Sequence, residues 1–103
     1  MRYIKTYEDT QDELQIGDYV WCDEFKFSSS RYFTLNNIGQ YVRKAEIITN
    51  PQQFMIRYEN VPTSLRYVFT TDNCRTMGRS EIIFFSPNKE DCEACLAANK
   101  YNL

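Results

Sequence analysis

The chain has 103 residues, of which 43% are hydrophobic, 16% aromatic and 25% charged, and its formal net charge is −2. This length and composition predict one ordered globular domain, because disordered chains lack the apolar and aromatic residues that offset the entropy of ordering the backbone. The sequence contains no histidine, which excludes Ser-His-Asp and Cys-His catalysis and His-ligated zinc. No apolar run reaches the roughly 18 residues that a membrane span needs, so we expect no membrane partner.

Charge is segregated along the chain. Residues 1–24 hold seven acids and two cations, residues 25–79 hold three acids and eight cations, and residues 80–103 hold four acids and two cations. We favour the interpretation that these segments neutralise each other in the fold, since charge blocks in a sequence need not form surface patches. The alternative is a basic, aromatic face that meets phosphate or an acidic partner.

The first predicted elements are an arm, a strand and a loop. Residues 1–13 are expected to form an arm or edge strand, and residues 14–22 a turn at Gly17 followed by a strand. Alternation in this strand places Ile16, Val20 and Cys22 on one face and Tyr19 and Trp21 on the other. Because both sets are apolar, we expect both faces of the strand to be covered. Residues 23–37 predict a long polar loop whose aromatic side chains fold back onto the core: Phe25, Phe27, Tyr32 and Phe33.

Two further strands and a short helical insert are predicted next. The β-branched and aromatic residues of 41–48 favour a strand that ends at Asn50-Pro51. Residues 54–59 alternate as a half-buried antiparallel strand, with Phe54, Ile56 and Tyr58 inward and Met55, Arg57 and Glu59 outward. In residues 63–69 the spacing of Leu65, Val68 and Phe69 predicts one or two helical turns, capped by Thr63 or Ser64.

The C-terminal part predicts two strands and a helix. A short strand is expected at residues 74–77 and a buried strand at residues 81–85. Ser86-Pro87 then opens a helix, because proline suits a first helical position and Glu90-Asp91 favour the positive end of the helix dipole. We expect Cys92, Cys95 and Leu96 to share one face of this helix.

The four cysteines suggest two kinds of chemistry, neither of which we favour. The motif Cys92-Glu93-Ala94-Cys95 after a strand locally resembles a thioredoxin or glutaredoxin site, but Cys92 lies more than a turn inside the helix and only eight residues follow Cys95. An all-thiolate zinc site would use Cys22, Cys74, Cys92 and Cys95, although structural zinc sites usually show two close pairs. The first residues hold no signal-peptide apolar region, so we expect a cytoplasmic protein with free thiols and no cofactor.

Aromatic and arginine side chains give the remaining functional hypothesis. Stacking rings beside guanidinium groups hold single-stranded nucleic acid or an acidic peptide. The candidate binding residues are Tyr19, Trp21, Tyr41, Arg43, Arg57, Arg75 and Arg79. The alternative for each aromatic residue is packing within a small barrel.

The order of motifs resembles small SH3-like barrels. The segments that carry the resemblance are Ile16-Gly17-Asp18-Tyr19-Val20, Ile38-Gly39-Gln40-Tyr41-Val42, Phe54-Met55-Ile56-Arg57-Tyr58 and Ser80-Glu81-Ile82-Ile83. The start of the chain, Met-Arg-Tyr-Ile-Lys-Thr-Tyr-Glu, and the overall layout also look like small uncharacterised proteins of tailed phages. The resemblance implies a binding role, since such barrels usually bind peptides, nucleic acid or other subunits and rarely catalyse.

We therefore expect a mainly β (α+β) domain: a five-stranded SH3-like barrel over residues 14–86 with a short helical insert, followed by a C-terminal helix and tail over residues 87–103. The expected function is a non-enzymatic protein-binding module, phage-encoded and acting in the host cytoplasm on a host or phage protein. The alternatives are a nucleic-acid binder that uses the basic 25–79 segment, and a structural virion subunit or homo-oligomer that closes through strand edges.

Overall fold

The fold is an α+β arrangement of one antiparallel sheet and a C-terminal helix, seen in a computed structural model that describes residues 13–24, 29–45 and 52–101. Five strands lie in the order β4-β3-β2-β1-β5, and every neighbouring pair is antiparallel. Their bounds are β1 Tyr19–Cys22, β2 Gly39–Lys44, β3 Gln53–Arg57, β4 Cys74–Gly78 and β5 Ile82–Ser86. The helical elements are α2 Arg31–Leu35, η1 Thr63–Val68, η2 Arg79–Glu81 and α3 Lys89–Tyr101.

The expected barrel is not closed. Closure would require a ladder between the edge strands β4 and β5, and no such ladder exists among the described residues. Instead the chain leaves β4 through the single turn η2 and adds β5 to the other side of the sheet, beside β1. Two register shifts, near Trp21 and near Tyr41, increase the local twist and bend of the sheet.

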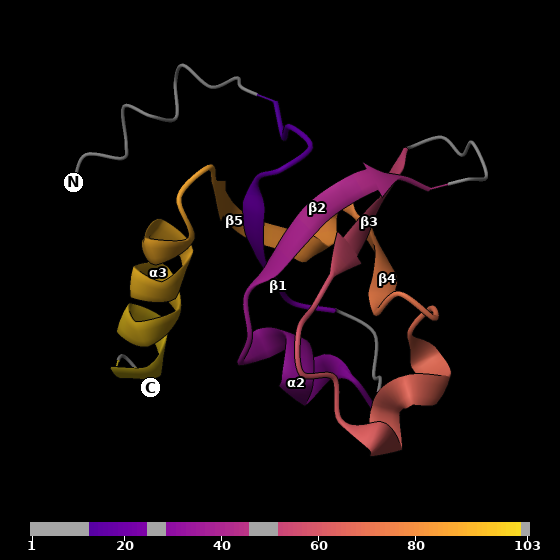
Figure 1. The fold of residues 1–103 in the computed structure, drawn as a ribbon. Coiled ribbons are helices and arrows are strands. Elements are labelled where there is room, and N and C mark those ends of the chain that lie inside the picture. Colours follow the sequence, from indigo (N-terminus) through magenta and orange to yellow (C-terminus); the bar gives the residue numbers. More distant parts are fainter. Residues whose placement is uncertain (1–12, 25–28, 46–51, 102–103) are drawn as a thin grey trace.

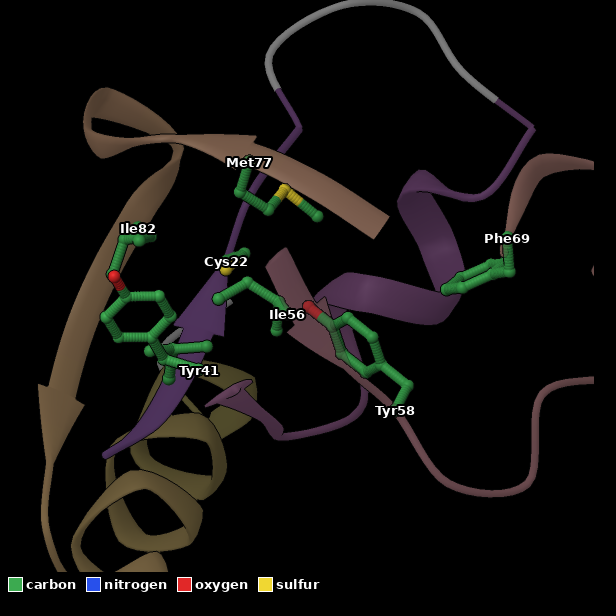
Figure 2. Close-up of a cluster of buried hydrophobic side chains, with 8 residues drawn as sticks. Cys22, Tyr41, Ile56, Tyr58, Phe69, Met77 and Ile82 are labelled. Carbon is green, nitrogen blue, oxygen red and sulfur yellow. The ribbon is translucent and has the colours of Figure 1, made fainter. Parts of the chain in front are cut away.

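The core fills one face of the sheet and is closed by residues from outside it. Its buried cluster contains Val20, Cys22, Tyr41, Ile56, Tyr58, Phe69, Met77 and Ile82. Figure 2 shows Tyr58 between Ile56 and Phe69. Phe33 of α2 contacts the rings of Tyr58 and Phe69 edge-to-face, with ring centroids 5.6 and 5.9 Å apart, a geometry that favours aromatic packing. The prediction that Phe33 folds back onto the core is confirmed.

The helical elements cover two different parts of the sheet. Figure 1 shows α3 beside β5 and β1, with α2 and η1 lying together at one end of the sheet. The Cys92 thiol of α3 donates to the carbonyl of Tyr19 at 3.3 Å, which fixes the helix against β1. None of the helices in the described part of the chain is long and apolar enough to cross a membrane.

Several expectations about single elements need correction. Ile16 is 62% exposed, because the turn at Gly17, with φ of 102°, places it outside β1. Residues 31–35 form a helix rather than a loop, and Tyr32 on it is exposed rather than packed inward. Met55 lies on the sheet face opposite to Phe54 and Ile56, as the alternation predicts, but it is buried there rather than exposed. The η1 turn follows Pro62 without a side-chain cap from Thr63 or Ser64.

Other expectations are confirmed or lie outside the described residues. β1 is covered on both sides, since Val20, Trp21 and Cys22 are all buried. The helical insert, the strand at 74–77 and the C-terminal helix are present, and Leu65, Val68 and Phe69 pack on the core cluster. Residues 1–12, 25–28, 46–51 and 102–103 are not described, so the outcomes for Phe25, Phe27 and the last part of the 41–48 strand lie outside the structure.

Candidate functional site: a groove between helix α3 and the sheet

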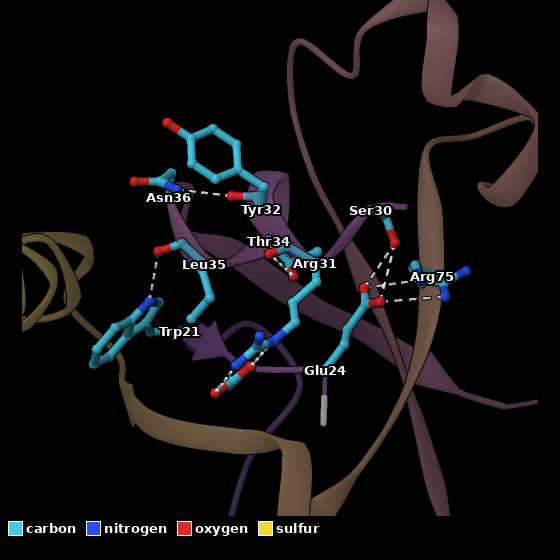
Figure 3. Close-up of polar contacts among 10 residues, drawn as sticks. Trp21, Glu24, Ser30, Arg31, Tyr32, Thr34, Leu35, Asn36 and Arg75 are labelled. Atoms are coloured by element: carbon cyan, nitrogen blue, oxygen red, sulfur yellow. Dashed lines mark hydrogen bonds and ion pairs between the residues drawn. The ribbon is translucent and has the colours of Figure 1, made fainter. Parts of the chain in front are cut away.

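The seven residues predicted to form a binding face do not lie on one exposed face. Trp21 and Tyr41 are only 5% and 3% exposed. The Trp21 indole N–H donates to the Leu35 carbonyl at 3.0 Å, at the end of α2 (Figure 3), and the Tyr41 ring packs edge-to-face on Phe54. Both rings are therefore unavailable for stacking on a ligand.

Three of the four predicted arginines make intramolecular contacts. Arg43 pairs with Asp72 at 2.9 Å, and Arg75 pairs with the buried Glu24 at 2.9 Å. Arg79 lies over the Phe85 ring, 5.0 Å from its centroid, and donates to the Ile82 carbonyl. Of these contacts, the Arg75–Glu24 pair joins the basic 25–79 segment to the acidic 1–24 segment, as the neutralisation interpretation expects, whereas Arg43 and Asp72 both belong to the basic segment. The contacts leave Arg57 and Tyr19 as the predicted residues that reach a surface depression.

That depression is a shallow groove between α3, the α2–β2 connection and the end of β3. It has two adjoining parts, of about 170 and 70 Å³, which share the side chains of Ile38, Glu59 and Lys89. The larger part adds Asn36, Asn37, Asn60, Glu93 and Leu96. The smaller part adds Tyr19, Gly39, Gln40 and Arg57.

Helix α3 supplies one continuous wall of the groove. Lys89, Glu93 and Leu96 line it, and their spacing of four and three residues places them on one stripe of the helix. Cys92 lies beside this stripe, three residues after Lys89 and four before Leu96, and is buried against β1. The packing of Cys92 thus fixes the rotation of α3 and leaves the Lys89–Leu96 stripe at the edge of the contact between the helix and the sheet.

Three of the amide side chains in the groove donate to backbone carbonyls. Asn36 and Asn37 donate their N–H groups to the carbonyls of Tyr32 and Phe33, and Gln40 donates to the Gly17 carbonyl. An amide that donates to the protein in this way keeps its carbonyl oxygen for another partner. The groove is consequently rich in hydrogen-bond acceptors beside the apolar surfaces of Ile38 and Leu96.

An exposed tyrosine stands next to one end of the groove. Tyr32 precedes Asn36 by one helical turn of α2 and is 80% exposed. Figure 3 shows its ring beside the Asn36 amide. Exposed tyrosine is a residue that often anchors protein interfaces, because its large ring loses little conformational entropy on binding.

The buried carboxylate of Glu24 links several elements that surround α2. It accepts two hydrogen bonds from Arg75, and the Ser30 hydroxyl, a single donor, lies 3.0 Å from each of its two oxygens (Figure 3). Arg75 also donates to the Val68 carbonyl at the end of η1. This network joins the chain after β1 to α2, β4 and η1, so it supports the α2 position on which the groove depends.

The pKa of each of the four cysteine thiols is raised above the ordinary cysteine value. Burial raises the pKa of Cys22 and of Cys92 to about 12, and burial also raises the pKa of Cys74 and of Cys95. These thiols stay protonated at neutral pH, whereas the thiolate is the nucleophile and the metal ligand. The described residues, which include all four cysteines, contain no cluster of three or more metal-ligating side chains.

Sequence reasoning missed most of the groove. Among the candidate residues it named, Tyr19 and Arg57 line the groove, while Asn36, Asn37, Gln40, Asn60 and the α3 stripe carried no signal for binding. The spacing of Lys89, Glu93 and Leu96 shows only that these residues share one stripe of the predicted helix, and it does not by itself indicate binding. A scan against protein-family models and searches of curated proteins and of solved structures found no match for this chain.

Proposed function

We propose that this chain is a small protein-binding module that holds a segment of its partner in the groove beside α3. The observation that carries the proposal is the groove lining itself: a mostly polar surface of amide and charged side chains that also includes the apolar residues Ile38 and Leu96. A polypeptide segment brings both backbone N–H donors and apolar side chains, which match these two kinds of surface.

The distribution of cations supports a protein partner over nucleic acid. Within the basic 25–79 segment, Arg31, Arg43 and Arg75 pair with acidic side chains of this chain. Such pairs reduce the charge left for phosphates, which dominate nucleic-acid affinity. The groove also contains Glu59 and Glu93, which repel a phosphate backbone.

We further propose that the sheet is an open relative of the SH3-like barrels that the sequence resembles. Its support is the strand order, the two bulges that bend the sheet and the single helical turn η2 before β5. A phage origin, with a site of action in the host cytoplasm, remains a prediction from the sequence resemblance.

The test is affinity capture by the tagged protein from nuclease-treated bacterial lysate, read by mass spectrometry. We expect the wild type to recover a dominant protein and Glu93→Trp, whose ring fills the groove, to lose it. Glu90→Trp is the matched control, because Glu90 is exposed on the same helix and does not line the groove. Melting curves establish that both variants fold.

Three results would contradict this proposal. Equal recovery by Glu93→Trp would place the interface elsewhere. Capture that depends on nucleic acid would favour the basic segment. Recovery of the bait alone would favour self-assembly through the β4 or β5 edge.

A further inference from the structure

The charges along the groove are arranged in order. The two parts of the groove share Glu59 and Lys89, whose opposite charges offset each other in the middle. Beyond this middle, the part next to β1 and β2 contains the Arg57 guanidinium, and the part next to α2 contains the Glu93 carboxylate. The groove is therefore neutral in total, with a positive end and a negative end.

These charges are available to a ligand. Arg57, Glu59, Lys89 and Glu93 are all exposed, and none forms an ion pair within the part of the chain that the structure describes. In contrast, Arg31, Arg43 and Arg75 are paired with acids of the same chain. The protein thus neutralises several of its cations in ion pairs, whereas Arg57 and Glu93 at the two ends of the groove form no such pair among the described residues.

We infer that the groove binds a polypeptide segment in one direction, with an acidic side chain of the segment at Arg57 and a basic side chain at Glu93. This inference rests on the proposed function and names the chemistry of the partner. A guanidinium holds a carboxylate through two parallel hydrogen bonds, and a carboxylate accepts from lysine or arginine. Complementary charges at the two ends fix register and direction, because the reversed segment places like charges together.

The lining between the two ends suits an extended main chain. The carbonyl oxygens of Asn36, Asn37 and Gln40 are left to accept from backbone N–H groups, and Ile38 and Leu96 supply apolar contact. A nucleic acid offers no cation for Glu93, and an acidic peptide without a basic residue meets repulsion there. Both ligands fit the groove less well than a segment that carries both charges.

The experiment selects binders from a library of random 12-residue peptides displayed on yeast, with the purified full chain as the probe. We expect the enriched peptides to carry an acid and a base in one preferred sequence order. For the double variant Arg57→Glu with Glu93→Arg, selection should enrich the opposite order, and peptides selected on the wild type should bind this variant about tenfold more weakly or worse. The control double variant, Arg66→Glu with Glu13→Arg, reverses exposed charges outside the groove and should keep the wild-type order.

A third variant separates the inference from the proposed function. Gln40→Trp fills the groove without changing its charge. If Gln40→Trp blocks the selected peptides, but these peptides show no preferred order of an acidic and a basic residue, the inference is wrong and the protein-binding groove stands. If Gln40→Trp blocks no selected peptide, the groove is not the docking site and both proposals fail.

Discussion

Gly39, at the first position of β2, lies where a side chain has no room. A Cβ atom there would stand 2.4 Å from Cγ2 of Ile56 and 2.9 Å from Cζ of Tyr58, and both of those side chains are fully buried. Forcing an extra carbon into a packed core costs about 1–3 kcal/mol. We expect Gly39→Ala to lower the free energy of unfolding by that amount.

Gly78 provides the comparison for this change. A Cβ atom at Gly78 would have Glu81 Oε1 as its nearest neighbour, at an ordinary contact distance of 3.7 Å, and its φ of −82° suits any residue. Urea denaturation of the two alanine variants measures the difference between their free energies of unfolding. Equal stability of Gly39→Ala and Gly78→Ala would show that the Ile56–Tyr58 contact is not tight.

Asp72 is the clearest titrating residue outside the core. A hydrogen bond from Thr70, together with the bond from Arg43, lowers the pKa of Asp72 from 3.8 to about 2. Because the folded state favours the ionised carboxylate, the stability that this carboxylate contributes is fully present above pH 3.8 and is lost as the pH falls through about 2.

Substitution of either donor should raise the pKa of Asp72. We expect Thr70→Val to remove the largest single cause of the low pKa, the hydrogen bond from Thr70, and Arg43→Gln to remove the charge-assisted bond and the positive charge of Arg43. An NMR titration of the Asp72 carboxyl carbon measures each value. A pKa near 3.8 in the wild type would refute the Thr70–Asp72–Arg43 arrangement.

At the scale of elements, the network around Glu24 connects parts of the chain that the sheet ladders do not. Glu24 follows β1, Arg75 lies on the edge strand β4, and Ser30 precedes α2. Removing the cation of such a buried pair leaves an unpaired buried charge, which costs about 3–5 kcal/mol. We expect Arg75→Met to destabilise the fold by about that amount.

Arg43→Met is the matched control for this substitution. It also removes an ion pair of β2 with the 70–73 loop, but that pair is exposed to solvent, and exposed pairs contribute little to stability. Thermal denaturation of the two variants should show a much larger loss for Arg75→Met. Similar losses would show that Glu24 is not held as a buried charge.

The helix α2 illustrates the limit of prediction from sequence at this scale. Its five residues are too few to show a helical period, and Ser30 makes no N-terminal cap because its hydroxyl is bound to Glu24. The helix is held instead by Phe33 on the core rings and by the buried Thr34. In contrast, the alternation in β1 and β3 and the proline before α3 were sufficient to predict those elements.

At the scale of the whole molecule, the sheet is bent but open, and this shape accounts for the exposed Ile83. The register shift between Trp21 and Cys22 gives β5 one extra residue at Ile83, which is 47% exposed. Bulges of this kind are not visible in an apolar run such as Ile82–Phe85. Local alternation therefore predicted the strands, whereas curvature and closure depended on pairing that only the folded chain reveals.

The candidate site could be predicted less well than the fold. Aromatic and arginine side chains indicated binding by their chemistry, yet Trp21, Tyr41 and Arg75 are used for packing and internal charge pairing. The groove is assembled from β1, the α2–β2 connection, β2, the end of β3 and α3, and its amides acquire a role only through the backbone carbonyls that orient them. Such a site depends on tertiary placement, which no single segment encodes.

The most direct test of the protein-binding groove is photo-crosslinking in living bacteria with a diazirine-bearing lysine analogue placed at position 89 or at position 44. This analogue keeps a slender side chain, so it does not fill the groove with a ring. Lys89 lines both parts of the groove, whereas Lys44 is exposed on β2 and does not line it. We predict a nuclease-resistant adduct with one partner protein from position 89 and none from position 44. An adduct from position 44 alone, equal adducts from both positions, or no protein adduct from position 89 would contradict the assignment of the groove as the interface.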